Sequence, residues 1–313
     1  MPPFDLPPIP ADSTTRFAPS PTGYLHLGHV ANAVWTWGVA QAVGARVLLR
    51  LEDHDRGRCR PEYEAALLED LDWLGLVPDR LSRESLAGGP SSFRQSDSQA
   101  RYQAALTRLA QATDVYACVC SRKAIAALLG DDAPGPGEEP RYPGTCREAS
   151  LEIEVGRGVR AILPDLAVDF TDLRLGPLTQ TPSAQCGDLL LKDSTGNWTY
   201  QFSVVVDDLE HGVDLIVRGD DLLESTGRQI LLGQLLGRTS PPRYLHHPLI
   251  LDARGVKLSK RSGAPGLRTL REDGLGAGEV LGLAARATGL TEAIGSLEPG
   301  CLGELFRVRA WER

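Results

Sequence analysis

The stretch Thr15-Arg-Phe-Ala-Pro-Ser-Pro-Thr-Gly23, with the apolar run Leu27–Val43 that follows it, decides the fold of this chain. Residues 15–18 have the composition of a strand end, and the Pro- and Gly-rich turn after them stops the strand abruptly. The run from 27 to 43, rich in Ala, Val and Trp, predicts a helix. The order of strand, tight turn and helix indicates an α/β protein with a parallel sheet, in which ligands bind at the carboxyl ends of the strands.

A second strand and helix follow directly. Residues 46–51 are apolar and β-compatible, and they end in the acidic cluster Glu52-Asp-His-Asp55. Pro61 marks the start of a helix, with leucines at helical spacing before Gly75. Farther along we expect helices over 98–111, 225–236 and 280–287, and strands over 200–206 and 213–218. This alternation supports an α/β domain with a parallel sheet.

The amino-acid composition changes in the middle of the chain. Residues 112–185 hold three cysteines and the Gly-, Pro- and acid-rich segment 130–140, which we expect to be a loop. We therefore predict a division into four parts. These are the first half of an α/β domain (1–111), an insertion (112–185), the second half of the domain (186–250), and a loop with a short, mainly helical C-terminal region (251–313).

Composition sets the broad class. The 313 residues include 33 Lys+Arg and 41 Asp+Glu, a formal net charge of −8, and 42% of residues are hydrophobic. Global disorder is excluded, and bulk attraction to nucleic acid or anionic membranes is disfavoured, although a local basic face is compatible with the sum. The chain has no apolar run of about 18 residues and no signal-peptide pattern, so we expect a cytoplasmic protein with no membrane contact and with reduced cysteines.

Two motifs far apart in sequence point to polyphosphate chemistry. His26-Leu-Gly28-His29 opens the predicted helix, and a helix N-terminus attracts anions. Lys257-Leu-Ser-Lys260-Arg261 offers two cations on a late loop, suited to the other side of a polyphosphate. Each motif alone is common by chance, and the lysines alone would suit a solvated loop. Their co-occurrence in this order favours stabilisation of charge on a transferring nucleotidyl group.

Several motifs together resemble the catalytic core of the class I glutamyl-tRNA synthetases, from about residue 14 to residue 290. They are Arg16-Phe-Ala-Pro-Ser-Pro-Thr-Gly23 with His26–His29, Arg50-Leu-Glu-Asp-His-Asp55, Tyr200-Gln-Phe-Ser-Val-Val-Val-Asp-Asp208, Arg218-Gly-Asp-Asp-Leu222 and Lys257–Arg261. The resemblance implies a Rossmann-like domain split by an insertion that contacts tRNA. It further implies catalytic roles for His26, His29, Lys257 and Lys260, and an ATP site that contains His26, Gly28, His29 and Lys260, with Mg²⁺ accompanying ATP.

The resemblance also implies a glutamate pocket. Its positions would be Arg16, Phe17, Ala18, Pro19, Ser20, Glu52, Tyr200 and Arg218. Glutamate has two carboxylates and one ammonium, so two arginine forks and one carboxylate suit it, and the tyrosine can form a wall. The residues do not decide which arginine holds which carboxylate. Asp207 and Asp208 could be a metal pair, but we favour a turn at the end of a strand.

The cysteines form a second signal. Cys118-x-Cys120 and Tyr142-x-x-x-Cys146 bracket the predicted loop, and three thiolates leave a tetrahedral zinc ion one ligand short. Three reduced, buried cysteines are the alternative. Here the resemblance narrows to the glutamyl-queuosine tRNA(Asp) synthetases, and it implies one structural Zn²⁺ with Tyr142 as fourth ligand, where a water or another side chain is the other option. The isolated Cys59, Cys186 and Cys301 are expected to be ordinary small apolar residues.

Two more features favour that subgroup. Only about 50 residues follow Arg261, so we expect no helical anticodon-binding domain. Ordinary bacterial members typically have Tyr-His-Leu-Ala-Asn where this chain has Tyr200-Gln-Phe-Ser-Val204.

The implied partners are therefore L-glutamate, ATP and tRNA(Asp) carrying queuosine, and no protein partner is indicated. The implied reaction forms glutamyl-adenylate and transfers the glutamyl group to queuosine in the anticodon. A truncated glutamyl-tRNA synthetase that acylates a tRNA 3′ end or another acceptor, and an inactive tRNA-binding paralogue, are the alternatives.

Overall fold

The computed structural model describes residues 3–80, 86, 89–130, 135, 139–251 and 266–309. The first four elements of the α/β domain agree closely with those predicted from the sequence. Strand β2 (Thr14–Phe17) leads into helix α1 (Leu27–Val43), and β3 (Arg46–Leu49) leads into α2 (Pro61–Leu74). The strands β2 and β3 pair in parallel, as expected. Both helices end at glycines in the left-handed region, with φ of 74° at Gly44 and 69° at Gly75, a conformation that favours glycine.

The second group of strands continues this parallel arrangement. Strands β9 (Leu215–Gly219), β10 (Arg243–His247) and β6 (Val168–Asp172) pair in parallel, and β7 (Gly176–Gln180) adds an antiparallel edge. β2 adjoins β9, because the Asp214 backbone N–H donates to the Thr14 carbonyl at 3.1 Å. Farther along the two strands, Arg16 Nη1 donates to the Val217 carbonyl. The two strands thus run in the same direction, and the carboxyl ends of β2, β3, β9 and β10 face the same edge.

One expected strand is a helix. Residues 200–206 were predicted as a strand, but Tyr200–Glu210 forms helix α7. Every residue from 202 to 208 is buried, so the run shows no alternation between polar and apolar faces and imitates a buried strand. The prediction of a strand-end turn at Asp207 and Asp208 is wrong for the same reason, since both lie buried in this helix.

The other expected elements of this half are confirmed. After β9, the 3-10 helix η3 (Asp220–Ser225) leads into α8 (Thr226–Leu235). The predicted helix over 98–111 corresponds to α4 (Gln99–Leu109), which follows the short 3-10 helix η1 (Gln95–Asp97).

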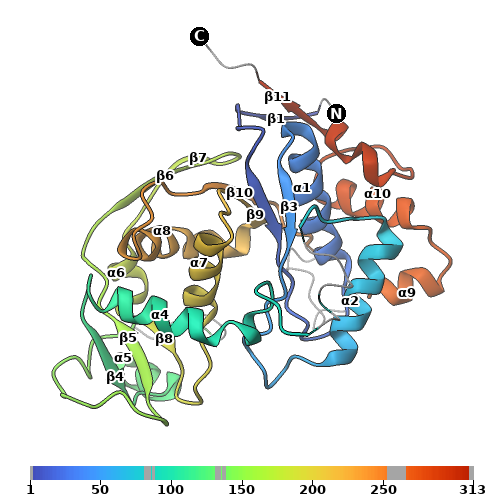
Figure 1. Cartoon of the computed structure of the whole chain (residues 1–313). Helices are drawn as coiled ribbons and strands as arrows, with labels where there is room; N and C mark the ends of the chain where they lie inside the picture. Colours follow the sequence, from blue (N-terminus) through green and yellow to red (C-terminus); the bar gives the residue numbers. More distant parts are fainter. Residues whose placement is uncertain are drawn as a thin grey trace.

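A small antiparallel sheet forms a separate lobe, at the lower left of Figure 1. It consists of β4 (Val115–Cys118), β5 (Gly158–Ala161) and β8 (Leu189–Lys192), and helices α5 (Arg122–Leu129) and α6 (Pro182–Cys186) accompany it. The sheets do not follow the predicted boundary at residue 185, because each of two sheets combines strands from before and after it. β6 and β7 join β10 and β9, whereas β8 joins β4 and β5. The four-part division of the chain stays a prediction.

The C-terminal region packs on α1. It consists of α9 (Leu267–Glu272), α10 (Ala277–Ala287), the 3-10 helix η5 (Pro299–Leu305) and β11 (Phe306–Val308). The predicted helix over 280–287 is confirmed by α10. β11 pairs in parallel with β1 (Phe4–Leu6), so the two ends of the described chain lie together at the top of Figure 1. None of the described helices is both long and apolar enough to cross a membrane.

A glycine on α1 allows this close packing and gives a stability test. A Cβ at Gly38 would lie 2.3 Å from the Phe306 ring and 3.1 Å from the Leu302 carbonyl oxygen. Gly38→Ala should therefore lower the free energy of unfolding by about 1–3 kcal/mol, as overpacking does. A Cβ at Gly233, in α8, would meet its nearest atoms at 3.7 Å, so Gly233→Ala should be neutral or stabilise by up to about 1 kcal/mol. Urea unfolding of both variants checks this, and equal midpoints would contradict the tight α1–β11 contact.

Candidate active site and metal centre

A cavity of about 480 Å³ lies at the carboxyl ends of the parallel strands and at the N-terminus of α1. It brings together every described residue that the sequence predicted for glutamate or ATP. These are Arg16, Phe17, Ala18, Pro19, Ser20, His26, Gly28, His29, Glu52, Tyr200 and Arg218. They come from segments up to about 200 residues apart, so the fold assembles one site from the predicted motifs.

The predicted lysines Lys257 and Lys260 lie outside the described residues. Described residues before and after them on the chain either line the cavity or contact a residue that lines it. Ile250 lines the cavity, and Gly266 forms an antiparallel bridge with His26. The Leu267 backbone N–H also donates to the Leu25 carbonyl at 2.9 Å.

The two histidines cap α1 with their ring nitrogens. His26 Nδ1 accepts from the Gly28 backbone N–H at 3.1 Å, and His29 Nδ1 accepts from the His26 backbone N–H at 3.1 Å. A ring nitrogen that accepts carries no proton, so in each neutral imidazole the proton is on Nε2. Both rings are thus N–H donors in one fixed tautomer, at a helix end whose dipole favours an anion.

Four buried charged groups form a continuous chain beneath the cavity. Arg16 Nε lies 3.4 Å from Asp208 Oδ1, and Arg50 Nη1 donates to the same oxygen at 2.6 Å. Arg50 Nη2 donates to Glu52 Oε1 at 2.8 Å. Burial alone would raise the pKa of Asp208, but the charges of Arg50 and Arg16 outweigh it and hold the pKa below its usual value. The chain fixes the cation Arg16 and the anion Glu52 relative to each other.

Arg218 is held by neutral groups instead. Its Nε donates to His246 Nε2 at 3.0 Å and its Nη1 to Gln229 Oε1 at 2.6 Å. Its Nη2 donates to the Leu222 carbonyl and the Thr226 hydroxyl. These bonds use four of the five guanidinium N–H groups, so one N–H on Nη1 remains for a ligand. Arg16 keeps more capacity, because its Nη2 has no hydrogen-bond partner among the described residues.

Sequence reasoning missed other residues that line the cavity. They are Ala31, Asn32, Val217, Gly219, Asp221, Leu222, His247, Pro248, Leu249 and Ile250. Asn32 Nδ2 lies 3.0 Å from His247 Nε2, and burial lowers the pKa of His247 to about 4, so this histidine is neutral. Residues 247–250 end and follow the parallel strand β10. The rule that ligands bind beyond carboxyl strand ends could have identified them, had that strand been predicted.

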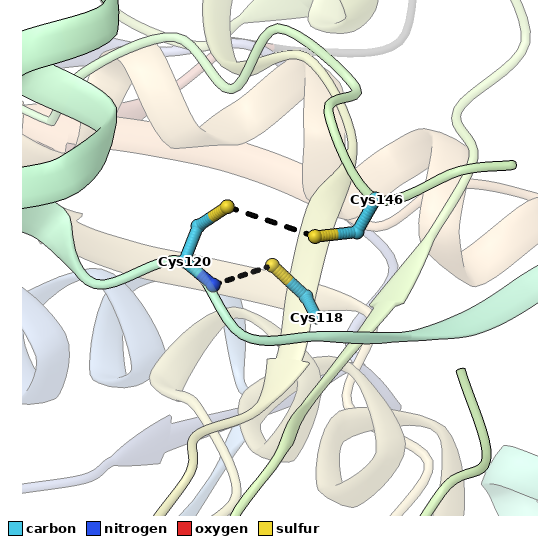
Figure 2. Close-up of side chains that lie close together, drawn as sticks. All are labelled: Cys118, Cys120 and Cys146. Carbon is cyan, nitrogen blue, oxygen red and sulfur yellow. Dashed lines mark hydrogen bonds between the residues drawn. The ribbon is translucent and has the colours of Figure 1, made fainter. Parts of the chain in front are cut away.

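The three clustered cysteines, drawn in Figure 2, come from two segments: Cys118 is the last residue of β4 with Cys120 just after it, and Cys146 lies in a later turn. The Sγ atoms of Cys118, Cys120 and Cys146 are all within 4.8 Å of one another, with Cys120 and Cys146 3.6 Å apart. The Tyr142 hydroxyl lies 3.4 Å from Cys118 Sγ and 3.9 Å from Cys120 Sγ. A tetrahedral zinc ion with Zn–S bonds of about 2.3 Å spaces its sulfur ligands about 3.8 Å apart, so the three thiols could hold such a metal.

The surroundings of the cluster shift the pKa values of two thiols in opposite directions, and burial raises the pKa of Cys120 to about 11. Arg160 Nε donates to Cys118 Sγ at 3.3 Å, and its guanidinium lies 3.7 Å from the centre of the Tyr142 ring. Burial raises the pKa of the Cys146 thiol, but hydrogen bonds from the Tyr142 hydroxyl and the Val119 backbone N–H outweigh it. The pKa of Cys146 therefore lies below its ordinary value. Of the remaining cysteines, Cys186 is buried and Cys301 is exposed.

Comparisons with known sequences agree with this geometry. The family described as tRNA synthetases class I (E and Q), catalytic domain, matches residues 13–276. Two proteins named Glutamyl-Q tRNA(Asp) synthetase are close relatives. That of Nitratidesulfovibrio vulgaris is 41% identical, over 88% of this chain and 86% of its own length, and that of Deinococcus radiodurans is 42% identical, over 86% of both. Glutamate–tRNA ligase 2 of Acidithiobacillus ferrooxidans is 38% identical over 96% of this chain but 63% of its own length.

A solved structure supports the same relationship. The glutamate-tRNA synthetase of Elizabethkingia anophelis superposes with a TM-score of 0.75 at 26% identity, covering 96% of this chain and 68% of that one. The predicted α/β fold and the predicted enzyme class are thereby confirmed. The chain belongs to the class I tRNA synthetases of the E and Q type, and it is a ligase with glutamyl-tRNA synthetase-type catalysis.

Proposed function

We propose that this enzyme activates L-glutamate with ATP and transfers the glutamyl group to queuosine in the anticodon of tRNA(Asp). The observation that carries the proposal is the extent of the similarity to proteins of that name. Three of them are 39–42% identical to the chain, and it covers 86–91% of their own lengths. For two ligases named for glutamate and tRNA the covered share is 53% and 63%.

The charges around the cavity suit L-glutamate. Arg16 offers a fork of N–H donors to one carboxylate, and Arg218 offers a single N–H to the other. Glu52 Oε1 already accepts from Arg50, which leaves its second oxygen for the ammonium group. Tyr200 lines the same cavity, and burial raises the pKa of its hydroxyl, so it stays protonated and can donate. Phe17, Ala18, Pro19 and Ser20 form the adjoining wall.

The N-terminus of α1 suits the phosphates of ATP. His26 and His29 donate from Nε2, and Gly28 leaves room for a close approach of the ligand, because a Cβ there would lie 3.0 Å from the His26 ring. Lys257 and Lys260, which lie outside the described residues, are proposed to add positive charge for the phosphates. A glutamate carboxylate oxygen then bonds to the α-phosphorus as the bond to the pyrophosphate oxygen breaks, and pyrophosphate leaves. Mg²⁺ that accompanies ATP neutralises part of the phosphate charge.

A structural Zn²⁺ completes the proposal. Cys118, Cys120 and Cys146 supply three thiolates. The Tyr142 hydroxyl oxygen lies 3.4 Å from Cys118 Sγ and 3.9 Å from Cys120 Sγ, a spacing that suits a fourth ligand of the same ion. Such a closed site stabilises the lobe that carries it and takes no part in the chemical step.

The acceptor is tested by labelling. Purified enzyme, ATP and radiolabelled glutamate are incubated with tRNA(Asp) that carries queuosine and with the same tRNA prepared without it. Label should enter only the queuosine-containing tRNA, and tRNA(Glu) should stay unlabelled. Equal labelling of queuosine-free tRNA(Asp), or labelling of tRNA(Glu), would favour acylation of a 3′ end. No glutamate-dependent pyrophosphate exchange at all would favour an inactive paralogue.

The buried charge chain predicts a selective defect. In Asp208→Asn the amide no longer balances Arg16 and Arg50, so the KM for glutamate in pyrophosphate exchange should rise at least about tenfold. The KM for ATP should stay within about twofold. Asp214→Asn is the matched control, because the Asp214 carboxylate also holds β2, but at the amino end of that strand, where it accepts from Ser13 and Thr14.

Thermal unfolding of both variants separates loss of fold from loss of binding. An unchanged KM for glutamate in a folded Asp208→Asn enzyme would contradict the role of these buried charged groups in glutamate binding.

Metal analysis tests the zinc site. Wild-type enzyme should contain about one zinc per chain, and Cys118→Ser should lose most of it, because three ligands hold the ion far less tightly than four. Cys186→Ser is the control, since Cys186 is buried nearby on α6 and its Sγ bonds to the Pro182 carbonyl instead. Equal zinc in Cys118→Ser and wild type would exclude Cys118 as a ligand.

A further inference from the structure

A second cavity, of about 570 Å³, adjoins the active site. It lies between the β4–β5–β8 sheet and the loop that follows β3. Its lining includes His54, Arg58, Arg122 and Trp198. Tyr200 lines both this cavity and the active-site cavity, so the two share a wall. A volume of this size accommodates a nucleoside.

A buried hydrogen-bond chain leads from the protein interior to this second cavity. Gln95 Nε2 donates to Asp207 Oδ2 at 2.9 Å, and Gln95 Oε1 lies 2.7 Å from His54 Nδ1. Asp207 also accepts from Arg101 Nη1 and the Tyr102 hydroxyl, each at 2.8 Å, so donors surround its carboxylate. Gln95 and Asp207 are both fully buried.

This chain fixes the tautomer of His54. Because the carboxylate accepts, the Gln95 amide must turn its NH₂ group toward Asp207 and its oxygen toward His54. That oxygen can only accept, so His54 Nδ1 carries the proton. In the neutral imidazole the lone pair then lies on Nε2, the reverse of the tautomer at His26 and His29.

The position of His54 gives that lone pair a use. The ring is half-buried, lines the second cavity and lies with its centre 6.4 Å from the centre of the Tyr200 ring. Its Nε2 has no hydrogen-bond partner among the described residues. An imidazole that is held through Nδ1 and presents Nε2 beside an active site has the arrangement of a general base.

We propose that the second cavity receives the acceptor nucleoside of the RNA and that His54 is the general base of the transfer step. The inference rests on the proposed function, in that the acceptor is a hydroxyl of an RNA nucleoside. The hydroxyl oxygen bonds to the carbonyl carbon of glutamyl-adenylate, and its proton passes to His54 Nε2. The bond from that carbon to the phosphate oxygen breaks, and AMP leaves with the electron pair.

The rim of the cavity suits the rest of an RNA. Arg58 and Arg122 are both exposed on the lining, where they can contact phosphates. Arg58 pairs with Asp55 through an exposed ion pair of 2.6 Å, which contributes little stability and exchanges easily for a phosphate contact.

The two half-reactions give the test. In His54→Asn, glutamate-dependent pyrophosphate exchange should stay within about threefold of wild type. Transfer from pre-formed glutamyl-adenylate to tRNA, measured in a single turnover, should fall about 100-fold or more, the usual share of a general base. His211→Asn is the control, since His211 lies 3.4 Å from Arg101 in the same network but outside the lining of the second cavity, and it should alter neither step.

A second variant distinguishes loss of the base from a general disturbance of the site. In His54→Ala, added imidazole should restore transfer without changing exchange. Transfer near the wild-type rate in His54→Asn, or no rescue by imidazole in His54→Ala, would overturn the assignment. If wild-type enzyme leaves queuosine-containing tRNA(Asp) unlabelled, the proposed function fails, and His54 is then judged on the tRNA that the wild type does label.

Discussion

Arg50 is a guanidinium with no exposed surface, and the active site depends on how its charge is balanced. A buried cation without partners would cost several kcal/mol, so the fold must bring carboxylates to it. It does so with Glu52, two residues away, and with Asp207 and Asp208 from α7. Asp208 in turn holds Arg16, and Asp207 holds Gln95. The buried charge of Arg50 thus holds α7 in place through Asp207 and Asp208. Through the same two carboxylates it orients Arg16 and Gln95.

The balance of charge in this cluster also bears on ligand binding. Three arginines, Arg16, Arg50 and Arg101, face three carboxylates, Glu52, Asp207 and Asp208, so the cluster is neutral as a unit. Arg218 adds a positive charge whose four hydrogen-bond partners are neutral groups. Arg218 thus presents to the cavity a positive charge that none of its direct hydrogen-bond partners balances, which suits a carboxylate of the ligand. Arg218 can hold its position without a carboxylate because Asp172 orients His246, and His246 accepts from Arg218.

The sequence predicts the local parts of this site well and the long-range parts poorly. α1 has the bounds expected from 27 to 43, because a turn and a left-handed glycine delimit it and both signals are local. α7 could not be recognised, since it is buried on all sides and its valines favour strands as much as helices. The pairing of Arg50 with Asp208 joins residues 158 positions apart, and nothing in either motif identifies the other as a partner. The resemblance to a family identified residues that line the cavity. The groups that orient such residues, for example Gln95, could be identified only from the structure.

The cysteine cluster bears on the second cavity through stability. In the described part of the chain, the apolar cluster around it has four buried residues, Cys118, Ile125, Tyr142 and Cys146, too few to hold a lobe by hydrophobic burial alone. A metal ion held by these cysteines would join β4 to the segment 142–146 and supply that missing stability. Cys118 and Cys120 also line the second cavity, as do His54 and Tyr200. Since a general base acts only on a hydroxyl held within hydrogen-bond distance, the wall that positions the acceptor must be rigid. A lobe cross-linked by a metal ion would provide such a wall, so a structural metal would affect the transfer step without touching a reacting atom.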